Sequence, residues 1–171
     1  MEYNYPYHWE FIFRETLKES FLMSLFVCLE FYLLNICAIV AWHNGFSGNI
    51  KTVCDEIKKQ KTEKGHGSFF EKNKKYLEKL IKNGDFDALD WGTIFRLWEV
   101  RNLITHAQGF CWGLKEKQIE ELKNFADETD GVSIREGYIS IESSFCKRAL
   151  ITINKFGSDL GNIVDNNFKK E

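Results

Sequence analysis

Three residues in one short stretch have side chains suited to phosphate chemistry. Arg101 carries a permanent cation, Asn102 a carboxamide and His106 an imidazole, within six consecutive positions. A guanidinium presents a planar fork of donors to phosphate oxygens, and imidazoles exchange protons near neutral pH. Side chains of these types are suited to holding a phosphodiester and moving a proton during its cleavage.

The geometry of these three residues depends on the helix that is expected to carry them. Apolar residues recur at helical spacing over 91–108, and Gly109 is a plausible stop. On such a helix Asn102 and His106 lie four apart and share a face. Arg101 and His106 differ by about 140° in azimuth and about 7.5 Å in height, so they flank a groove.

Length and composition predict a globular protein with one domain. The chain has 171 residues, 44% of them hydrophobic and 15% aromatic, which is enough to build a core. We expect a single domain over 1–171, with its core at 9–164 and arms at 1–8 and 165–171. The net charge of −2 provides no overall attraction to nucleic acid, so any such binding requires a local patch.

The cysteines favour free thiols in a reducing compartment, and we therefore expect a cytoplasmic protein. Their number is odd, and none forms a CxxC or CxxC…HxxxH pattern. No metal and no cofactor is expected. The five positions are Cys28, Cys37, Cys54, Cys111 and Cys146.

One long helix is predicted over 9–42, and its second half, Phe21–Trp42, is almost entirely apolar. Its length would span a bilayer. Glu30 in its centre argues against a membrane, because a carboxylate there is costly. We expect instead a helix buried in a bundle or across a dimer seam, with the transmembrane alternative as the minority interpretation. Glu30 is either a functional carboxylate or the partner of a cation, and the sequence leaves this open.

The remaining pattern predicts a mainly all-α fold, an up-down helical bundle with a small C-terminal β-hairpin. The hairpin is indicated by alternating apolar and polar residues on both sides of a glycine. The predicted strands are 132–135 and 138–141. The other predicted helices are 50–61, 69–82 (after a capping box at Ser68–Glu71), 115–128 and 145–164.

A lysine-rich segment, 51–82, contains ten lysines and five carboxylates. Such a run is usually a solvated helical surface. Alternatively, it contacts a phosphate backbone, with affinity but no sequence choice. The candidate substrate-binding residues are Lys72, Lys74 and Lys75, together with Thr105 beside Arg101.

The stretch from Arg101 to His106 resembles the signature of the HEPN superfamily, in which an arginine is followed by a polar residue and, a few positions later, by a histidine. Arg101, Asn102 and His106 match it residue by residue. The context is also similar: the motif lies late in a helix of a mainly helical chain, after a long apolar helix. The resemblance implies a HEPN-like bundle over most of the chain.

The resemblance further implies a metal-independent endoribonuclease, acting as an RNase toxin or antiviral-defence effector. Members of this superfamily form homodimers whose two motifs face one cleft, and an antitoxin or another defence subunit is a further expected partner. RNA supplies its own nucleophile, the 2′-hydroxyl, so the enzyme must transfer protons and stabilise charge on the phosphorane. Glu30 and Glu99 are possible supporting carboxylates.

Two other interpretations remain open from the sequence. Arg101 can be a structural residue that pairs with Glu99, Asp90 or Glu30, with His106 merely ending its helix. The domain can also be a catalytically inactive HEPN-like module that binds RNA or nucleotide, or that serves dimerisation.

Overall fold

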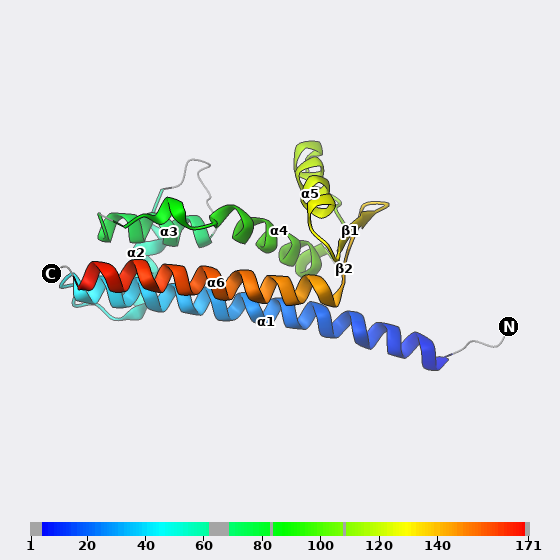
Figure 1. The fold of residues 1–171 in the computed structure, drawn as a ribbon, viewed down its shortest axis with the longest axis horizontal. Coiled ribbons are helices and arrows are strands. Elements are labelled where there is room, and N and C mark those ends of the chain that lie inside the picture. The colour runs from blue at the N-terminus through cyan, green and yellow to red at the C-terminus, as the bar shows by residue number, and fades with distance from the viewer. Residues whose placement is uncertain (1–4, 62–68, 83, 108, 170–171) are drawn as a thin grey trace. The chain divides into compact units, whose positions relative to one another are not determined.

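We analysed a computed structural model, which describes residues 5–61, 69–82, 84–107 and 109–169. It is mainly helical, with one antiparallel hairpin, as the sequence predicts (Figure 1). The chain divides into two compact units. The first comprises Met1–Phe26 and Gly92–Thr152, and the second comprises Val27–Trp91 and Ile153–Glu171. Each unit is described by itself below.

Helix α1 runs without interruption from Tyr5 to His43, so the prediction of an irregular arm over 1–8 is wrong for its last four residues. Pro6 is compatible with this start, because the N–H groups of the first helical turn have no intrahelical partner. Residues 1–4 lie outside the described part of the chain.

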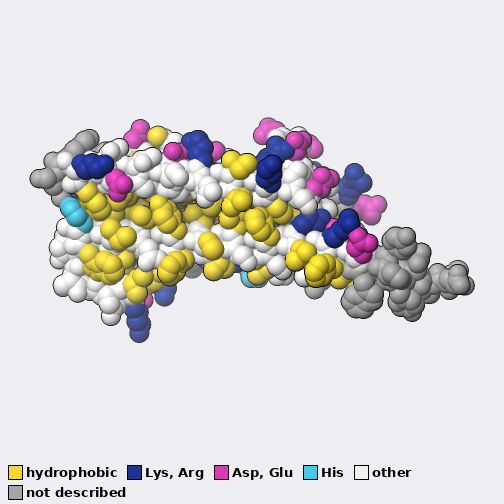
Figure 2. All heavy atoms as spheres, turned by 60° about the horizontal axis from the view of Figure 1, so that its bottom comes forward, with side chains coloured by type: hydrophobic (Ala, Val, Ile, Leu, Met, Phe, Trp, Pro, Cys, Tyr) yellow, Lys and Arg dark blue, Asp and Glu magenta, His cyan; other side chains and the backbone are white. Residues whose placement is uncertain are grey.

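One side of α1 is buried and the other is exposed. The prediction of a helix buried within a bundle therefore holds for one side only, and the alternative of burial across a dimer seam stays a prediction. Leu22, Phe26, Leu33 and Val40 are fully buried, whereas Val27 and Phe31 are more than half exposed. The segment Ile12–His43 is long and apolar enough to span a membrane by length and composition, and its most apolar stretch of 18 residues has a mean hydropathy of 2.1. Hydrophobic side chains are visible along α1 in Figure 2.

In the first unit, α4 (Trp91–Ala107) is followed by α5 (Glu116–Glu128) and by the hairpin of β1 (Val132–Arg135) and β2 (Tyr138–Ile141). The strands have the predicted bounds, and Val132 pairs with Ile141. The turn needs a left-handed backbone, which Glu136 adopts at φ 52° and Gly137 at φ 76°.

The second unit contains α2 (Ile50–Lys58), α3 (Phe69–Leu80) and a short 3₁₀ helix, Phe86–Ala88. Helix α2 ends three residues earlier than predicted. Lys72 of α3 donates to the carbonyl of Lys58, which the end of α2 leaves open, and Lys75 donates to the carbonyl of Lys61 in the following segment. Helix α3 ends two residues early, and Ser68 lies outside the described residues.

Helix α6 runs from Ser143 to Phe168. The predicted arm at 165–171 is therefore helical over its first four residues, and residues 170–171 lie outside the described chain. The ring of Phe168 stacks on His43 of α1, with centroids 4.0 Å apart. This contact between residues distant in sequence holds the last turn of α6 in place, where a polar tail would otherwise fray.

Candidate functional site

The end of α4 is held by the hairpin of the first unit. The N–H of Gly109 donates to the carbonyl of Leu103, and the N–H of Ile139 donates to the carbonyl of Gly109. Gly109 has φ +84°, and a Cβ there would lie 2.7 Å from the ring of Tyr138. A glycine is therefore required for both backbone and space. The hairpin thus positions the helical turn that carries His106.

Arg101 and Asn102 are joined directly. Nη1 of Arg101 donates to Oδ1 of Asn102 at 2.9 Å. Nε of Arg101 is buried, and no hydrogen-bond partner lies within the described part of the chain. The hydroxyl of Thr105 donates to the carbonyl of Arg101, so its single proton is already used.

A pocket of about 350 Å³ opens beside the last two turns of α4. Asn102 and His106 both line it, which confirms that they share a face of the helix. Arg101 is not a lining residue. The prediction that Arg101 and His106 flank one groove is therefore wrong for this pocket, because Arg101 contacts its wall only through the bond to Asn102. Trp98 adds a further wall from α4, and the loop after α4 and α5 supply Trp112, Leu114, Gln118 and Leu122.

Glu99 also lines this pocket, and its partner is Arg96. Arg96 contacts Glu99 at 2.9 Å and Glu121 at 3.1 Å, and so links α4 to α5. Burial alone would lower the pKa of Arg96, but hydrogen bonds to the two carboxylates raise it overall. The structural interpretation in which Glu99 neutralises Arg101 is therefore wrong, because Glu99 pairs with Arg96.

The described residues offer less support for a cysteine nucleophile or a metal site than for proton transfer by His106. Burial raises the pKa of the Cys111 thiol, which opposes formation of a nucleophilic thiolate near the pocket. No group of three or more His, Cys, Asp or Glu side chains within the described ranges is arranged to hold a metal ion.

The tryptophans near the motif have two different environments. Trp91 is buried and donates to the carbonyl of Phe86, so it is a packing residue. Trp112 is 77% exposed, stacks on Phe110 and lines the pocket. Its position after the helix, in a glycine-containing turn and outside any helical repeat, is the sequence signal that separates it from the core tryptophans.

The remaining predicted residues lie in the second unit. Lys74 contacts Asp87 at 2.9 Å and Glu78 at 3.6 Å, and Lys72 and Lys75 bind backbone carbonyls as described above. These lysines therefore have structural partners. Glu30 is half-buried on α1 and lines neither of the two pockets described here.

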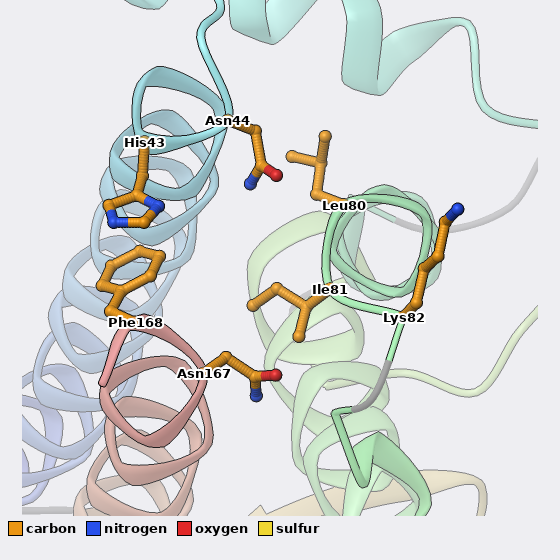
Figure 3. Close-up of a pocket in the computed structure, with 7 residues that line it drawn as sticks. All are labelled: His43, Asn44, Leu80, Ile81, Lys82, Asn167 and Phe168. Atoms are coloured by element: carbon orange, nitrogen blue, oxygen red, sulfur yellow. The ribbon is translucent and has the colours of Figure 1, made fainter. Parts of the chain in front are cut away.

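A second pocket, of about 280 Å³, lies in the second unit (Figure 3). Its residues come from the ends of α1, α3 and α6. His43 and Asn44 face Asn167 and Phe168. The Lys82 side chain points away from the cavity. The amide groups of Asn44 and Asn167 donate to backbone carbonyls of their own helices. The histidine stacks on Phe168, so this cavity has a packed ring at its edge.

Comparison with known proteins adds no constraint. No family model, no curated protein and no solved structure matches the chain. The candidate site must therefore be judged on its own geometry.

Proposed function

We propose that this protein is a HEPN-like, metal-independent endoribonuclease whose reacting groups lie at the pocket beside the end of α4. The observation that carries the proposal is that His106 and Asn102 line one open pocket while Asn102 binds the guanidinium of Arg101. A proton-transfer group and a carboxamide thus share one open pocket, and the carboxamide is hydrogen-bonded to a cation.

The proposed reaction uses the 2′-hydroxyl of the RNA as nucleophile. Its oxygen bonds to the adjacent phosphorus as the bond to the 5′-oxygen breaks, leaving a 2′,3′-cyclic phosphate and a 5′-hydroxyl. One group must accept the 2′-hydroxyl proton and another must protonate the leaving oxygen. His106 can perform either of these transfers, because its ring is exposed at the pocket.

Arg101 acts in this proposal through Asn102 as well as by charge. Because Oδ1 of Asn102 accepts from Arg101, the amide nitrogen of Asn102 is left to donate to a phosphate oxygen in the pocket. The positive charge of the Arg101 guanidinium adds to the potential at that oxygen. Trp112 offers an exposed ring on which a base can stack.

A single histidine cannot easily serve as both acid and base in one step. We propose that a second copy of the chain supplies the second group, so that the active form is a homodimer. We also propose a cytoplasmic toxin or antiviral-defence effector, held in check by an antitoxin or another defence subunit.

The test is incubation of the purified full-length chain with total RNA in EDTA, with the parent compared with His106→Ala. We expect the parent to produce fragments that end in 2′,3′-cyclic phosphate and the variant to produce none. Equal cleavage by both proteins would exclude His106 as the reacting group.

One observation favours a second candidate function, an inactive module that binds RNA or nucleotide. Arg101 is absent from the pocket wall, and the pocket is lined largely by apolar side chains. Such a module would bind a labelled oligoribonucleotide in EDTA without turnover, and Trp112→Ala would weaken that binding while His106→Ala would not.

A further inference from the structure

The pocket beside α4 belongs entirely to the first compact unit, and α5 supplies Gln118 to its lining. Oε1 of Gln118 accepts a hydrogen bond from the backbone N–H of Lys115 at 3.1 Å. This bond is part of a capping box, in which the side chain at the third helical position binds the N–H of the residue before the helix. The start of α5 therefore fixes the direction in which the amide of Gln118 is turned.

This orientation leaves a hydrogen-bond donor for a ligand. A carboxamide has an oxygen, which accepts, and an NH₂ group, which donates. Because Oε1 of Gln118 is bound to the backbone, Nε2 is the group that remains, and Gln118 is an exposed residue. Asn102 has the same arrangement, since its Oδ1 accepts from Arg101. Both carboxamides of the pocket thus present donors.

The other polar groups of the pocket agree with this preference. The indole N–H of Trp112 can only donate. The carboxylate of Glu99 is an acceptor, but its Oε2 is already bound by Arg96 at 2.9 Å. The rest of the described lining is largely apolar. A ligand of this pocket therefore needs an apolar body with hydrogen-bond acceptors at its edge.

The ring of Trp112 indicates that the apolar body is flat. One face of the indole stacks on Phe110, with ring centroids 4.3 Å apart and 23° between the ring planes. The indole is largely exposed, so its other face is open to a ligand. The pocket volume of about 350 Å³ lies within the range of sites that hold small molecules. A single nucleobase stacked on Trp112 meets these requirements.

We propose that Gln118 selects a keto base, uracil or guanine, over an amino base, cytosine or adenine, for the base that stacks on Trp112. This inference rests on the proposed function, because it takes RNA as the ligand. The keto oxygen of uracil or guanine accepts a hydrogen bond from Nε2 of Gln118. Cytosine and adenine carry an NH₂ group at the equivalent ring position, where two donors would meet without a hydrogen bond. Gln118 thus reads the base, while Asn102 serves the phosphate.

The first test measures the binding of labelled short oligouridylate, oligocytidylate and oligoadenylate in EDTA by fluorescence anisotropy. The full-length protein carries His106→Ala, so that the probe is not cleaved. We expect oligouridylate to bind about 3- to 10-fold more tightly than either amino oligomer, the usual value of one neutral hydrogen bond. Stacking strength alone would instead rank oligoadenylate first, because adenine has the larger ring system. Equal affinities, or tightest binding of oligoadenylate, overturn the proposal.

The second test adds Gln118→Glu to the same protein, which exchanges the donor for an acceptor and keeps the capping box, since glutamate also serves at this position. The added charge should weaken the binding of all three oligomers, while the ratio of oligouridylate to oligocytidylate affinity should reverse. Asn124→Asp is the matched control. It makes the same amide-to-carboxylate change at an exposed position of α5 outside the pocket lining, and it should keep the parent ratio. The same ratio in both variants overturns the proposal.

Cleavage separates this inference from the function on which it rests. In total RNA cut by the parent in EDTA, uracil or guanine should be enriched at one fixed position beside the cuts, and Gln118→Glu should shift the enrichment to cytosine or adenine. Cleavage by the parent without such enrichment overturns the selection of keto bases and leaves the nuclease proposal standing. A keto preference in binding without any cleavage supports the inference and favours the binding module. Absence of both RNA binding and cleavage overturns both proposals.

Discussion

Each unit of this molecule has a pocket with a helix-terminal histidine beside a carboxamide, and the two histidines are held differently. His43 ends α1 and stacks on Phe168, with centroids 4.0 Å apart and 19° between the ring planes. His106 lies in the last turn of α4, and no ring contact or hydrogen bond within the described residues is found for its imidazole. The packed ring of His43 contributes to the stability of the fold, whereas the imidazole of His106 is available to a substrate.

The carboxamides beside the two histidines also differ in their hydrogen-bond partners. The carboxamides of Asn44 and Asn167 donate to carbonyls of their own helices, so these groups serve the backbone. Asn102 instead accepts a hydrogen bond from the guanidinium of Arg101, a side chain and not a backbone group. Similar residue types thus produce a structural site in the second unit and a chemical candidate in the first.

The largest expected effect that separates the two histidines is on RNA cleavage. His106→Ala should lower the cleavage rate by about 10²–10⁴-fold, the usual contribution of a positioned acid or base. His43→Ala should leave it unchanged. The measurement is a single-turnover assay in EDTA, with circular dichroism to show that both variants are folded. Loss of activity in His43→Ala with an intact fold would refute the contrast.

The two arginines of α4 sharpen the contrast between chemical and structural groups. Arg101→Gln should reduce cleavage by roughly 10²-fold, because it removes both the charge and the donor that orients Asn102. Arg96→Gln should retain activity and lose at most about 1 kcal/mol of stability, because Arg96 bridges Glu99 and Glu121 at a partly exposed site. The converse pattern, with activity lost only in Arg96→Gln, would show that the proposal assigns the chemistry to the wrong arginine.

Much of the fold follows from local sequence patterns. The strands of the hairpin have the predicted bounds, because alternation and a turn glycine determine both register and ends. Asn102 and His106 share a pocket because a spacing of four residues places them on one helical face. These features depend only on residues close together in the sequence.

The errors have tertiary causes. The sequence pattern of α2 continues past Lys58, but lysines of α3 bind the carbonyls of Lys58 and Lys61 where the helix ends. The last turn of α6 is helical where Phe168 stacks on His43, a residue distant in sequence. The wall of the site formed by Gln118 and Leu122 depends on how α5 packs against α4. Sequence periodicity does not specify such packing, nor does it specify the side-chain rotamer that directs Arg101 onto Asn102.

A smaller expected effect concerns substrate affinity at the first pocket. Trp112→Ala should weaken RNA binding by about 1–3 kcal/mol, the usual value for one stacked base, and should leave the melting temperature nearly unchanged because the ring is 77% exposed. Fluorescence anisotropy with a labelled oligoribonucleotide provides the measurement. Unchanged affinity would remove base stacking from the proposed site.

The smallest expected effect tests the packing role assigned to His43. Removing either ring of the stacked pair should destabilise the second unit, and a double-mutant cycle of His43→Ala and Phe168→Ala should yield a coupling energy of about 0.5–1.5 kcal/mol in urea unfolding. His106→Ala should leave the unfolding free energy unchanged within about 0.5 kcal/mol, since its exposed ring has no such contact. Equal losses of stability from the two histidine variants would show that His106 also packs against the protein, and the structural distinction between the two pockets would be lost.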